Sequence, residues 1–207
     1  MTGTHKEKGM LFVISGPAGS GKGTVMNILT QKSPDFALSV SLTSRPMLKG
    51  EAEGVNYYYV TREEFEKKIA DGKVLEYTEY CGNYYGTPKD KAEEILNSGK
   101  HLLLEIEVDG AMQIKRAFPD AILVMILPPS VKVQEQRLRE RGRDDERSIE
   151  KRLKRTFEEL EFADRYDYIL INSDGLANDV ADALITIAEG MGANVQSSPD
   201  SVKHYFD

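Results

Sequence analysis

Short apolar segments alternate with longer amphipathic segments along most of the chain. A continuous apolar run covers residues 10–15, and largely apolar segments cover residues 101–108, 121–127 and 168–172. Such runs are typical of strands that are buried on both faces of a parallel sheet. Helical patterns separate them and fall at residues 21–31, 89–97, between 108 and 121, 131–166 and 176–189. The alternation predicts an α/β fold, with a three-layer α/β/α core around a mostly parallel sheet.

The rhythm changes between residues 39 and 87. Short tyrosine-rich segments of alternating polarity predict strands at residues 38–42, 55–60 and 74–80, followed by a turn at residues 81–86. Thr61 and Glu64 have the spacing of a capping box, which predicts a helix that runs to about Ala70. We expect this stretch to form a small mixed α/β subdomain inserted into the parallel core.

The segment from residue 131 to about residue 166 is helical in pattern and densely charged, and Gly142 interrupts it. A charged helical segment that can bend at a glycine has the character of a lid. A polar tail is expected over residues 191–207. The predicted domain covers residues 9–190, with a core at about 9–38, 88–130 and 160–190, an inserted subdomain at about 39–87 and a lid at about 131–159.

The composition is that of an ordinary globular protein, since 40% of the 207 residues are hydrophobic and 29% are charged. The net charge of -7 and the pI of about 5.2 argue against a broad nucleic-acid-binding face, which would be basic. No apolar run is long enough to span a membrane, and the single cysteine, Cys81, cannot form an intrachain disulfide. We therefore expect a cytoplasmic protein without nucleic-acid or membrane partners, whose oligomeric state the sequence leaves open.

The loop after the first predicted strand carries the clearest chemical signal. It reads Gly16-Pro17-Ala18-Gly19-Ser20-Gly21-Lys22-Gly23-Thr24 and opens a predicted helix. Glycines allow successive backbone N–H groups to converge on phosphate oxygens, and the helix N-terminus and Lys22 add positive charge. The spacing predicts a phosphate-binding P-loop. Gly23 stands where the usual pattern has Ser or Thr, so the hydroxyl that faces a metal stays undefined.

Three other groups of residues are weaker signals, because each also occurs on ordinary surfaces. Ser41 and Arg45 follow a predicted strand, where ligands of parallel sheets bind and where an arginine can hold a phosphate. Glu76 and Thr87 lie in the tyrosine-rich region, where a carboxylate can accept two guanine N–H groups and a hydroxyl can donate to O6. Arginines of the lid segment can neutralise a transferring phosphoryl group. They are Arg137, Arg139, Arg141, Arg143, Arg147, Arg152 and Arg155.

The order and spacing of these motifs resemble the guanylate kinases across roughly residues 9–190. The resemblance is carried by GPAGSGKGT (16–24), SVSLTSR (39–45), KGE…GVNYYYV (49–60), LEY…GNYYGT (75–87), LEIEVDG (104–110) and RLRERG…SIEKRL (137–153). It implies a three-part nucleoside-monophosphate kinase fold, with a P-loop core, a GMP-binding subdomain and a lid. It also implies Mg²⁺-dependent transfer of the γ-phosphoryl group of ATP to GMP, giving ADP and GDP, in purine nucleotide metabolism and GMP recycling.

The resemblance also implies roles for individual positions. ATP would be bound by Gly16, Pro17, Ala18, Gly19, Ser20, Gly21, Lys22, Gly23, Thr24, Arg137, Arg141 and, near the adenine, Asn172. GMP would be bound by Ser41, Arg45, Tyr57, Glu76, Tyr85, Thr87 and Glu107. The catalytic charges would be those of Lys22, Arg45, Arg137, Arg141 and Arg152. No side chain is expected to ligate Mg²⁺ directly, and Thr24 and Glu105 are candidates for contact through water.

Three features depart from the family pattern. Leu48 occupies the second arginine position of T-x-R-x-x-R-x-G-E, and Lys49 would leave the backbone in another direction. Loss of a charge-assisted phosphate contact costs about 1.5–3 kcal/mol, which predicts weaker GMP binding. Glu105 and Glu107 replace two aspartates and are each longer by a methylene. Asp109 replaces a glutamine, and the sequence does not define its role.

Two other functions fit parts of the sequence. A non-catalytic guanylate-kinase-like binding module would explain the altered GMP loop, but such modules typically lose the P-loop and the lid arginines that this chain keeps. A kinase for another nucleoside monophosphate could share the GKGT motif of the loop. Adenine, however, lacks the O6 acceptor and the N–H donors that Thr87 and Glu76 would read. An assay with several monophosphates separates these possibilities.

Overall fold

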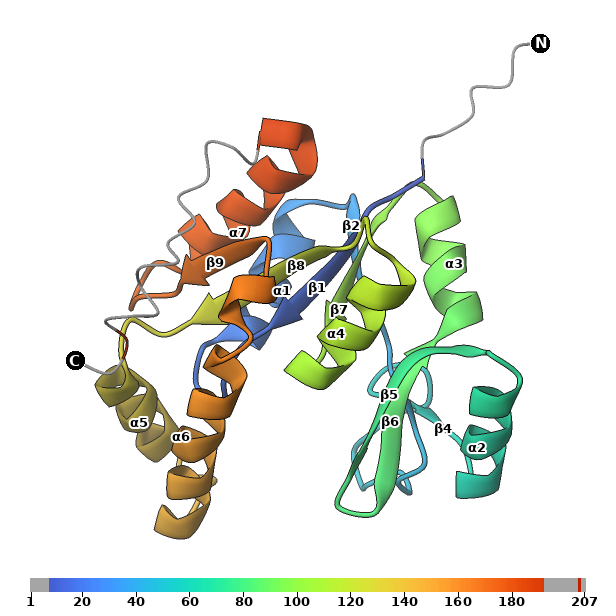
Figure 1. The fold of residues 1–207 in the computed structure, drawn as a ribbon, viewed down its shortest axis with the longest axis horizontal. Helices are drawn as coiled ribbons and strands as arrows, with labels where there is room; N and C mark the ends of the chain where they lie inside the picture. Colours follow the sequence, from blue (N-terminus) through green and yellow to red (C-terminus); the bar gives the residue numbers. More distant parts are fainter. Residues whose placement is uncertain (1–7, 192–204, 206–207) are drawn as a thin grey trace.

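The computed structural model describes residues 8–191 and residue 205, and its core is a five-stranded parallel sheet (Figure 1). The strand order is β2-β7-β1-β8-β9, and every neighbouring pair is parallel. The strands are β1 (Leu11–Ser15), β2 (Phe36–Leu38), β7 (His101–Glu105), β8 (Ile122–Leu127) and β9 (Tyr168–Ile171). This sheet confirms the predicted α/β class.

Helices cover both faces of this sheet and make the three predicted layers (Figure 1). Side chains of β1 alternate between the faces, so that Leu11 and Val13 enter one apolar cluster while Phe12 and Ile14 enter the other. The first cluster includes residues of α3 (Lys89–Asn97) and α4 (Val108–Ala117). The second includes residues of α1 (Lys22–Lys32) and α7 (Ala177–Thr186), which continues into a π-turn at Ile187–Met191.

A second, four-stranded sheet lies beside the core, in the order β4-β3-β6-β5. Its strands are β3 (Leu42–Thr43), β4 (Tyr58–Tyr59), β5 (Val74–Tyr80) and β6 (Asn83–Pro88). The sheet is mixed, because β3 pairs with β4 in parallel and with β6 antiparallel. Helix α2 (Arg62–Ala70) carries the predicted capping box, in which Thr61 accepts from Glu64 N and Glu64 reaches back to Thr61 N.

Four predicted boundaries were wrong. The strand predicted at residues 55–60 is only Tyr58–Tyr59, because Val55 and Asn56 lie in a turn. Residues 38–42 are not one strand: the chain leaves the core sheet after Leu38 and joins the second sheet at Leu42. The predicted turn at residues 81–86 is only Cys81 and Gly82, both with positive φ, and β6 follows at once. Such a two-residue turn matches the twist of the hairpin that joins Tyr80 to Asn83. The strand predicted at 101–108 ends at Glu105, because α4 begins at Val108.

Helices α5 (Val131–Glu140) and α6 (Glu146–Leu160) extend from the core on the same side as the second sheet (Figure 1). The predicted break near Gly142 is confirmed: Gly142 has a φ of 64°, and Asp145 caps α6 by accepting from Ser148 N at 2.8 Å. A short 3-10 helix (Ala163–Arg165) then leads to β9. Of the predicted polar tail, residues 192–204 and 206–207 lie outside the described part of the chain. Within the described part, no helix is long and apolar enough to cross a bilayer.

Candidate active site

The loop between β1 and α1 has the backbone of a phosphate-binding turn. Gly16 has a φ of 139°, and a Cβ there would lie 2.0 Å from the carbonyl oxygen of Ile126 on the neighbouring strand. Gly21 has a φ of 83°, and a Cβ there would lie 2.4 Å from the Asn172 side-chain nitrogen. Glycine is therefore required at Gly16 by backbone conformation and by space, and it is favoured at Gly21 by its left-handed backbone.

Side chains hold the carbonyl groups of this loop. The five successive carbonyl oxygens from Gly16 to Ser20 each accept a hydrogen bond from a side chain: Lys22 donates to Gly16 and Pro17, Gln134 to Ala18, Arg137 to Gly19 and Asn172 to Ser20. These bonds fix the backbone of the loop from Gly16 to Ser20 and occupy its carbonyl oxygens. The arrangement therefore favours an anion held by backbone N–H groups.

Lys22 is the buried cation of the loop. Burial lowers the pKa of its ammonium group, while the carboxylates of Glu105, Glu159 and Glu107 raise it. The ammonium group thus lies within the field of carboxylates from the end of β7 and from α6. Thr24, the candidate for contact with a metal-bound water, is exposed in the first turns of α1.

Helix α5 is attached to the P-loop through Arg137. Its guanidinium donates to Gly19 O at 3.3 Å and to Asn172 O at 2.8 Å, and it pairs with Asp174 at 2.7 Å. Asn172 is 5% exposed, and its amide donates to Ser20 O at 2.8 Å. The structure brings both predicted ATP-site residues to the loop, and both use hydrogen bonds to support it. Contact of Asn172 with an adenine stays a prediction.

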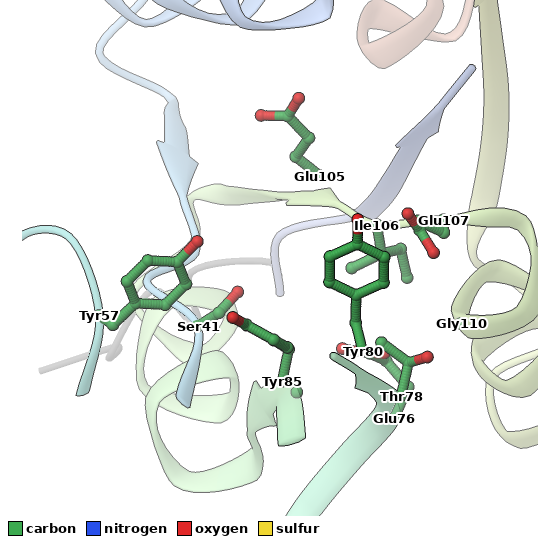
Figure 2. Close-up of a pocket in the computed structure, with 11 residues that line it drawn as sticks. Ser41, Tyr57, Glu76, Thr78, Tyr80, Tyr85, Glu105, Ile106, Glu107 and Gly110 are labelled. Atoms are coloured by element: carbon green, nitrogen blue, oxygen red, sulfur yellow. The ribbon is translucent and has the colours of Figure 1, made fainter. Parts of the chain in front are cut away.

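A cavity of about 340 Å³ lies between the second sheet and the end of β7. Figure 2 shows hydroxyl groups of Ser41, Tyr57 and Tyr85 on one side of it, with carboxylates opposite. Its lining consists of Ser41, Tyr57, Glu76, Thr78, Tyr80, Tyr85, Gly86, Glu105, Ile106, Glu107 and Gly110. Most of the predicted GMP-site residues therefore meet in one cavity, whose volume suits a small polar ligand.

Glu76 is the most deeply buried polar group of this cavity. Glu76 is only 3% exposed, and the Thr87 hydroxyl donates to its Oε1 at 2.8 Å. Gly110 lies so close that a Cβ there would be 2.7 Å from Glu76 Oε2. Burial raises the pKa of the Glu76 carboxyl to about 7, and the hydrogen bonds from Thr87 only partly oppose this. The structure thus brings Glu76 and Thr87 together in a direct hydrogen bond, and their contact with guanine stays a prediction.

The raised pKa of Glu76 predicts a pH-dependent contribution to stability. Folding raises the pKa from 4.5 to about 7, so the folded state binds the proton more tightly than the unfolded state. The stabilisation is complete below pH 4.5 and is lost as the pH rises through 7, by about 3 kcal/mol. Glutamine at position 76 cannot ionise. Between pH 4.5 and pH ~8, we therefore expect the unfolding free energy of the parent chain to fall by about 3 kcal/mol relative to that of Glu76→Gln.

Urea unfolding at both pH values measures this difference. Glu79→Gln is the matched control, because Glu79 lies on the same strand and is exposed. A difference between Glu76→Gln and the parent chain that does not change with pH would contradict the raised pKa.

Arg45 lies at the margin of the cavity. Its guanidinium is 5.4 Å from the centre of the Tyr57 ring and pairs with Glu51 at 2.7 Å. The Glu51 carboxylate also accepts from Leu48 N and from the Tyr59 hydroxyl, each at 2.8 Å, so it fixes the backbone of the loop. The bond from Arg45, helped by that from Leu48 N, lowers the pKa of Glu51 to about 2. The Leu48 side chain itself is 59% exposed.

The remaining two predicted arginines do not contact the P-loop. Arg141 pairs with Asp144 at 3.2 Å, and Arg152 pairs with the other oxygen of the same carboxylate at 3.0 Å. The Asp144 side chain is only 8% exposed, so it is the local counter-charge of the α5–α6 junction. Of the predicted lid arginines, the structure therefore brings only Arg137 to the loop.

Sequence reasoning missed two functional contacts. Arg155 of α6 pairs with Glu107, a cavity residue, at 2.5 Å and with Glu159 at 3.3 Å, so it joins α6 to the cavity. In the sequence, the spacing of Arg155 and Glu159 is that of an ordinary exposed helix pair. Gln134, which holds Ala18 O at 2.9 Å, is fully buried. The only signal for it was a polar residue on the apolar face of α5.

Comparison with known proteins agrees with this geometry. The family model described as "Guanylate kinase" matches residues 8–191. A guanylate kinase of Synechocystis sp. is 50% identical over 167 residues, which cover 81% of this chain and 87% of that protein. A guanylate kinase of Bacillus subtilis is 46% identical over 170 residues, which cover 82% of this chain and 83% of that protein.

A solved structure extends the similarity to three dimensions. The crystal structure of guanylate kinase from Anaplasma phagocytophilum superposes with a TM-score of 0.70 at 31% identity. The superposition covers 92% of this chain and 89% of that one. The family model spans nearly all of the described chain, and curated relatives are 46% and 50% identical over more than four fifths of it, so the chain belongs to the guanylate kinase family.

Proposed function

We propose that the chain transfers the γ-phosphoryl group of ATP to GMP, giving ADP and GDP, and so recycles GMP in cytoplasmic purine nucleotide metabolism. The observation that carries this proposal is that Glu76, which is bonded to the buried Thr87, lines the same cavity as Glu105, one of the carboxylates that act on Lys22 of the P-loop. A base-reading site and a phosphate-binding loop thus lie next to each other. Curated relatives of similar length bear the name guanylate kinase.

On the ATP side, the loop from Gly16 to Thr24 would hold the phosphates through its backbone N–H groups, with Lys22 as the mobile charge. Arg137 would contribute a second charge, because it already lies on the loop at Gly19. Arg141 and Arg152 would join the phosphates only after the α5–α6 lid moves and their bonds to Asp144 exchange for bonds to the nucleotide.

On the GMP side, Glu76 would accept guanine N–H groups, and Thr87 would turn its single hydroxyl hydrogen from Glu76 to O6. Arg45, with Ser41, Tyr57 and Tyr85, would hold the phosphate; these three residues line the cavity, and Arg45 borders it at Tyr57. Glu107 would be available to GMP once it is released from Arg155. The second sheet with its helix α2 would then be the GMP-binding subdomain, at about residues 39–87, between core segments.

Magnesium would enter with ATP. Among residues 8–191 and 205, no three His, Cys, Asp or Glu side chains gather into a set that could hold a metal ion. Carboxylate and hydroxyl oxygens of Glu105 and Thr24 fit an ion that keeps its water ligands and is bound mainly by nucleotide phosphates. Bound Mg²⁺ would neutralise charge that develops on the phosphates.

The chemistry requires little proton transfer from the chain. A GMP phosphate oxygen is anionic near neutral pH, so no side chain has to act as a general base. Lys22 and the arginines would align donor and acceptor and neutralise charge on the transferring group. Closing of the lid and the GMP-binding subdomain would exclude water and so limit hydrolysis of ATP.

A coupled assay of ADP release, with ATP and Mg²⁺ and with GMP, dGMP, AMP, CMP and UMP added separately, tests this proposal. We expect rapid turnover with GMP and far slower turnover with AMP, because adenine lacks the N1–H and N2 donors for Glu76 and the O6 acceptor for Thr87. Turnover with AMP as fast as with GMP would instead indicate a kinase for another monophosphate. Absence of turnover in folded, ATP-binding protein would indicate a non-catalytic binding module.

Leu48→Arg should lower the KM for GMP by about tenfold or more, because it adds a charge-assisted bond to the phosphate. The backbone of Leu48 is held by Glu51, the same carboxylate that holds Arg45, so a guanidinium there would start beside the first one. Leu48→Met, which adds no charge, is the matched control. Titration of GMP at saturating ATP measures the effect. An unchanged KM for GMP would mean that this position does not face the phosphate.

A further inference from the structure

Tyr205 is a buried residue outside the segment that matches the guanylate kinase family model. The match ends at residue 191, yet Tyr205 is fully buried within the apolar cluster on one face of the core sheet. Its carbonyl oxygen accepts from Val131 N at 3.0 Å, at the first residue of α5. A residue near the C-terminus therefore packs where the lid helix α5 leaves the core.

The Tyr205 phenol is part of a buried polar network that reaches the P-loop. It donates to Gln134 Oε1 at 2.9 Å, and Gln134 Nε2 donates to Ala18 O at 2.9 Å and to Thr156 Oγ1 at 2.8 Å. Gln134 and Thr156 are both fully buried. One amide thus joins the C-terminal tyrosine, α5, α6 and the nucleotide-binding loop.

The orientation of the Gln134 amide matters for the loop. Ala18 O can only accept a hydrogen bond, so the amide must present its NH₂ group there and its oxygen toward Tyr205. The phenol satisfies that buried oxygen, whose other partner, the Thr156 hydroxyl, is at the longer distance of 3.3 Å. A buried network with a missing donor is weakened at its other bonds as well. Loss of the phenol would therefore loosen the bond to Ala18.

We propose that Tyr205 is a positioning residue for the ATP site: through Gln134 it holds the Ala18 carbonyl, and with it the backbone of the P-loop, in place. This inference rests on the proposed binding of ATP phosphates at that loop. It gives a segment beyond the matched family region a role in nucleotide affinity. The GMP cavity does not include Tyr205, Gln134 or Ala18, so GMP affinity should be independent of the network.

Steady-state kinetics of Tyr205→Phe test the proposal. This variant keeps the ring and removes only the hydroxyl. We expect the KM for ATP to rise about three- to tenfold, as for the loss of one buried hydrogen bond, with the KM for GMP unchanged. Tyr168→Phe is the matched control. Tyr168 is a partly buried tyrosine of the core sheet and packs on the face opposite to the one that Tyr205 contacts. Its KM values should equal those of the parent chain.

A second variant identifies the route of the effect. Gln134→Leu removes the amide but keeps the apolar stem, and it should raise the KM for ATP at least as much as Tyr205→Phe. In the Gln134→Leu background, Tyr205→Phe should add nothing further, because both changes break the same link to Ala18. Fully additive effects on the KM for ATP would overturn a route through Gln134.

Amide hydrogen exchange of the nucleotide-free protein gives a readout that is independent of catalysis. Tyr205→Phe should accelerate exchange in the peptide that contains residues 16–21, and Tyr168→Phe should not. If Tyr205→Phe lowers only the Tm, while the KM for ATP and the loop exchange stay at parental values, the tyrosine is merely structural and the proposal is wrong. ATP binding that is insensitive to Lys22→Met would instead refute the proposed ATP site itself.

Discussion

Lys22→Met is expected to lower kcat by about 10²- to 10³-fold, the usual loss when a preorganised charge at a transferring group is removed. Lys22 is the buried cation of the loop, and its ammonium group is already held by the carbonyls of Gly16 and Pro17. Methionine keeps the length and the apolar stem, so the fold should persist while charge neutralisation is lost. Initial rates at saturating ATP and GMP measure the effect.

Lys32→Met is the matched control for this prediction. Lys32 is the last residue of the same helix, at the end away from the loop, and it pairs with Asp182 on the surface. We expect its kcat to match that of the parent chain, because an exposed ion pair contributes little to stability. If Lys22→Met retained parental kcat with intact folding, the assignment of the catalytic charge would be wrong.

Glu76→Gln should raise the KM for GMP by about ten- to a hundredfold, since it replaces a charged acceptor by an amide that also presents donors to the guanine edge. The pKa of Glu76 is raised to about 7, so the carboxylate that accepts guanine N–H groups is depleted as the pH falls below 7. We therefore expect the KM for GMP of the parent chain to rise below pH 7. This pH dependence should be absent from Glu76→Gln.

Comparison of the two chains isolates the titration of Glu76 from that of the GMP phosphate, which is the same in both assays. Glu79→Gln, an exposed carboxylate of the same strand, should behave as the parent chain does. Parallel pH profiles for the parent chain and Glu76→Gln would contradict the role of Glu76 in reading guanine.

Local chemistry predicted much of the fold and of the candidate site. The apolar run before Gly16 is a central strand, the capping box at Thr61 starts α2, and helix α3 has the predicted bounds. Glu76 and Thr87, both predicted at the guanine site, lie together in a direct hydrogen bond that the sequence did not predict. These features depend on short-range patterns, or on a motif whose members are fixed by one hairpin.

Features that depend on tertiary context were not predictable in this way. The run at residues 38–42 divides between two sheets, because the chain changes partners after Leu38, which a period-2 pattern does not reveal. Arg155 has the spacing of a surface pair, yet it reaches Glu107 across the site. Tyr205 occurs in a polar stretch, and only the folded chain shows it buried against Gln134.

Direct transfer between the two nucleotides is the central claim, and γ-labelled ATP tests it most directly. Incubation with Mg²⁺ and GMP, followed by separation of the products, should place the label in the β-phosphate of GDP, with little label in inorganic phosphate. Omission of GMP should leave the label in ATP. Label that appears in inorganic phosphate at the same rate with and without GMP, and never in GDP, would contradict the account.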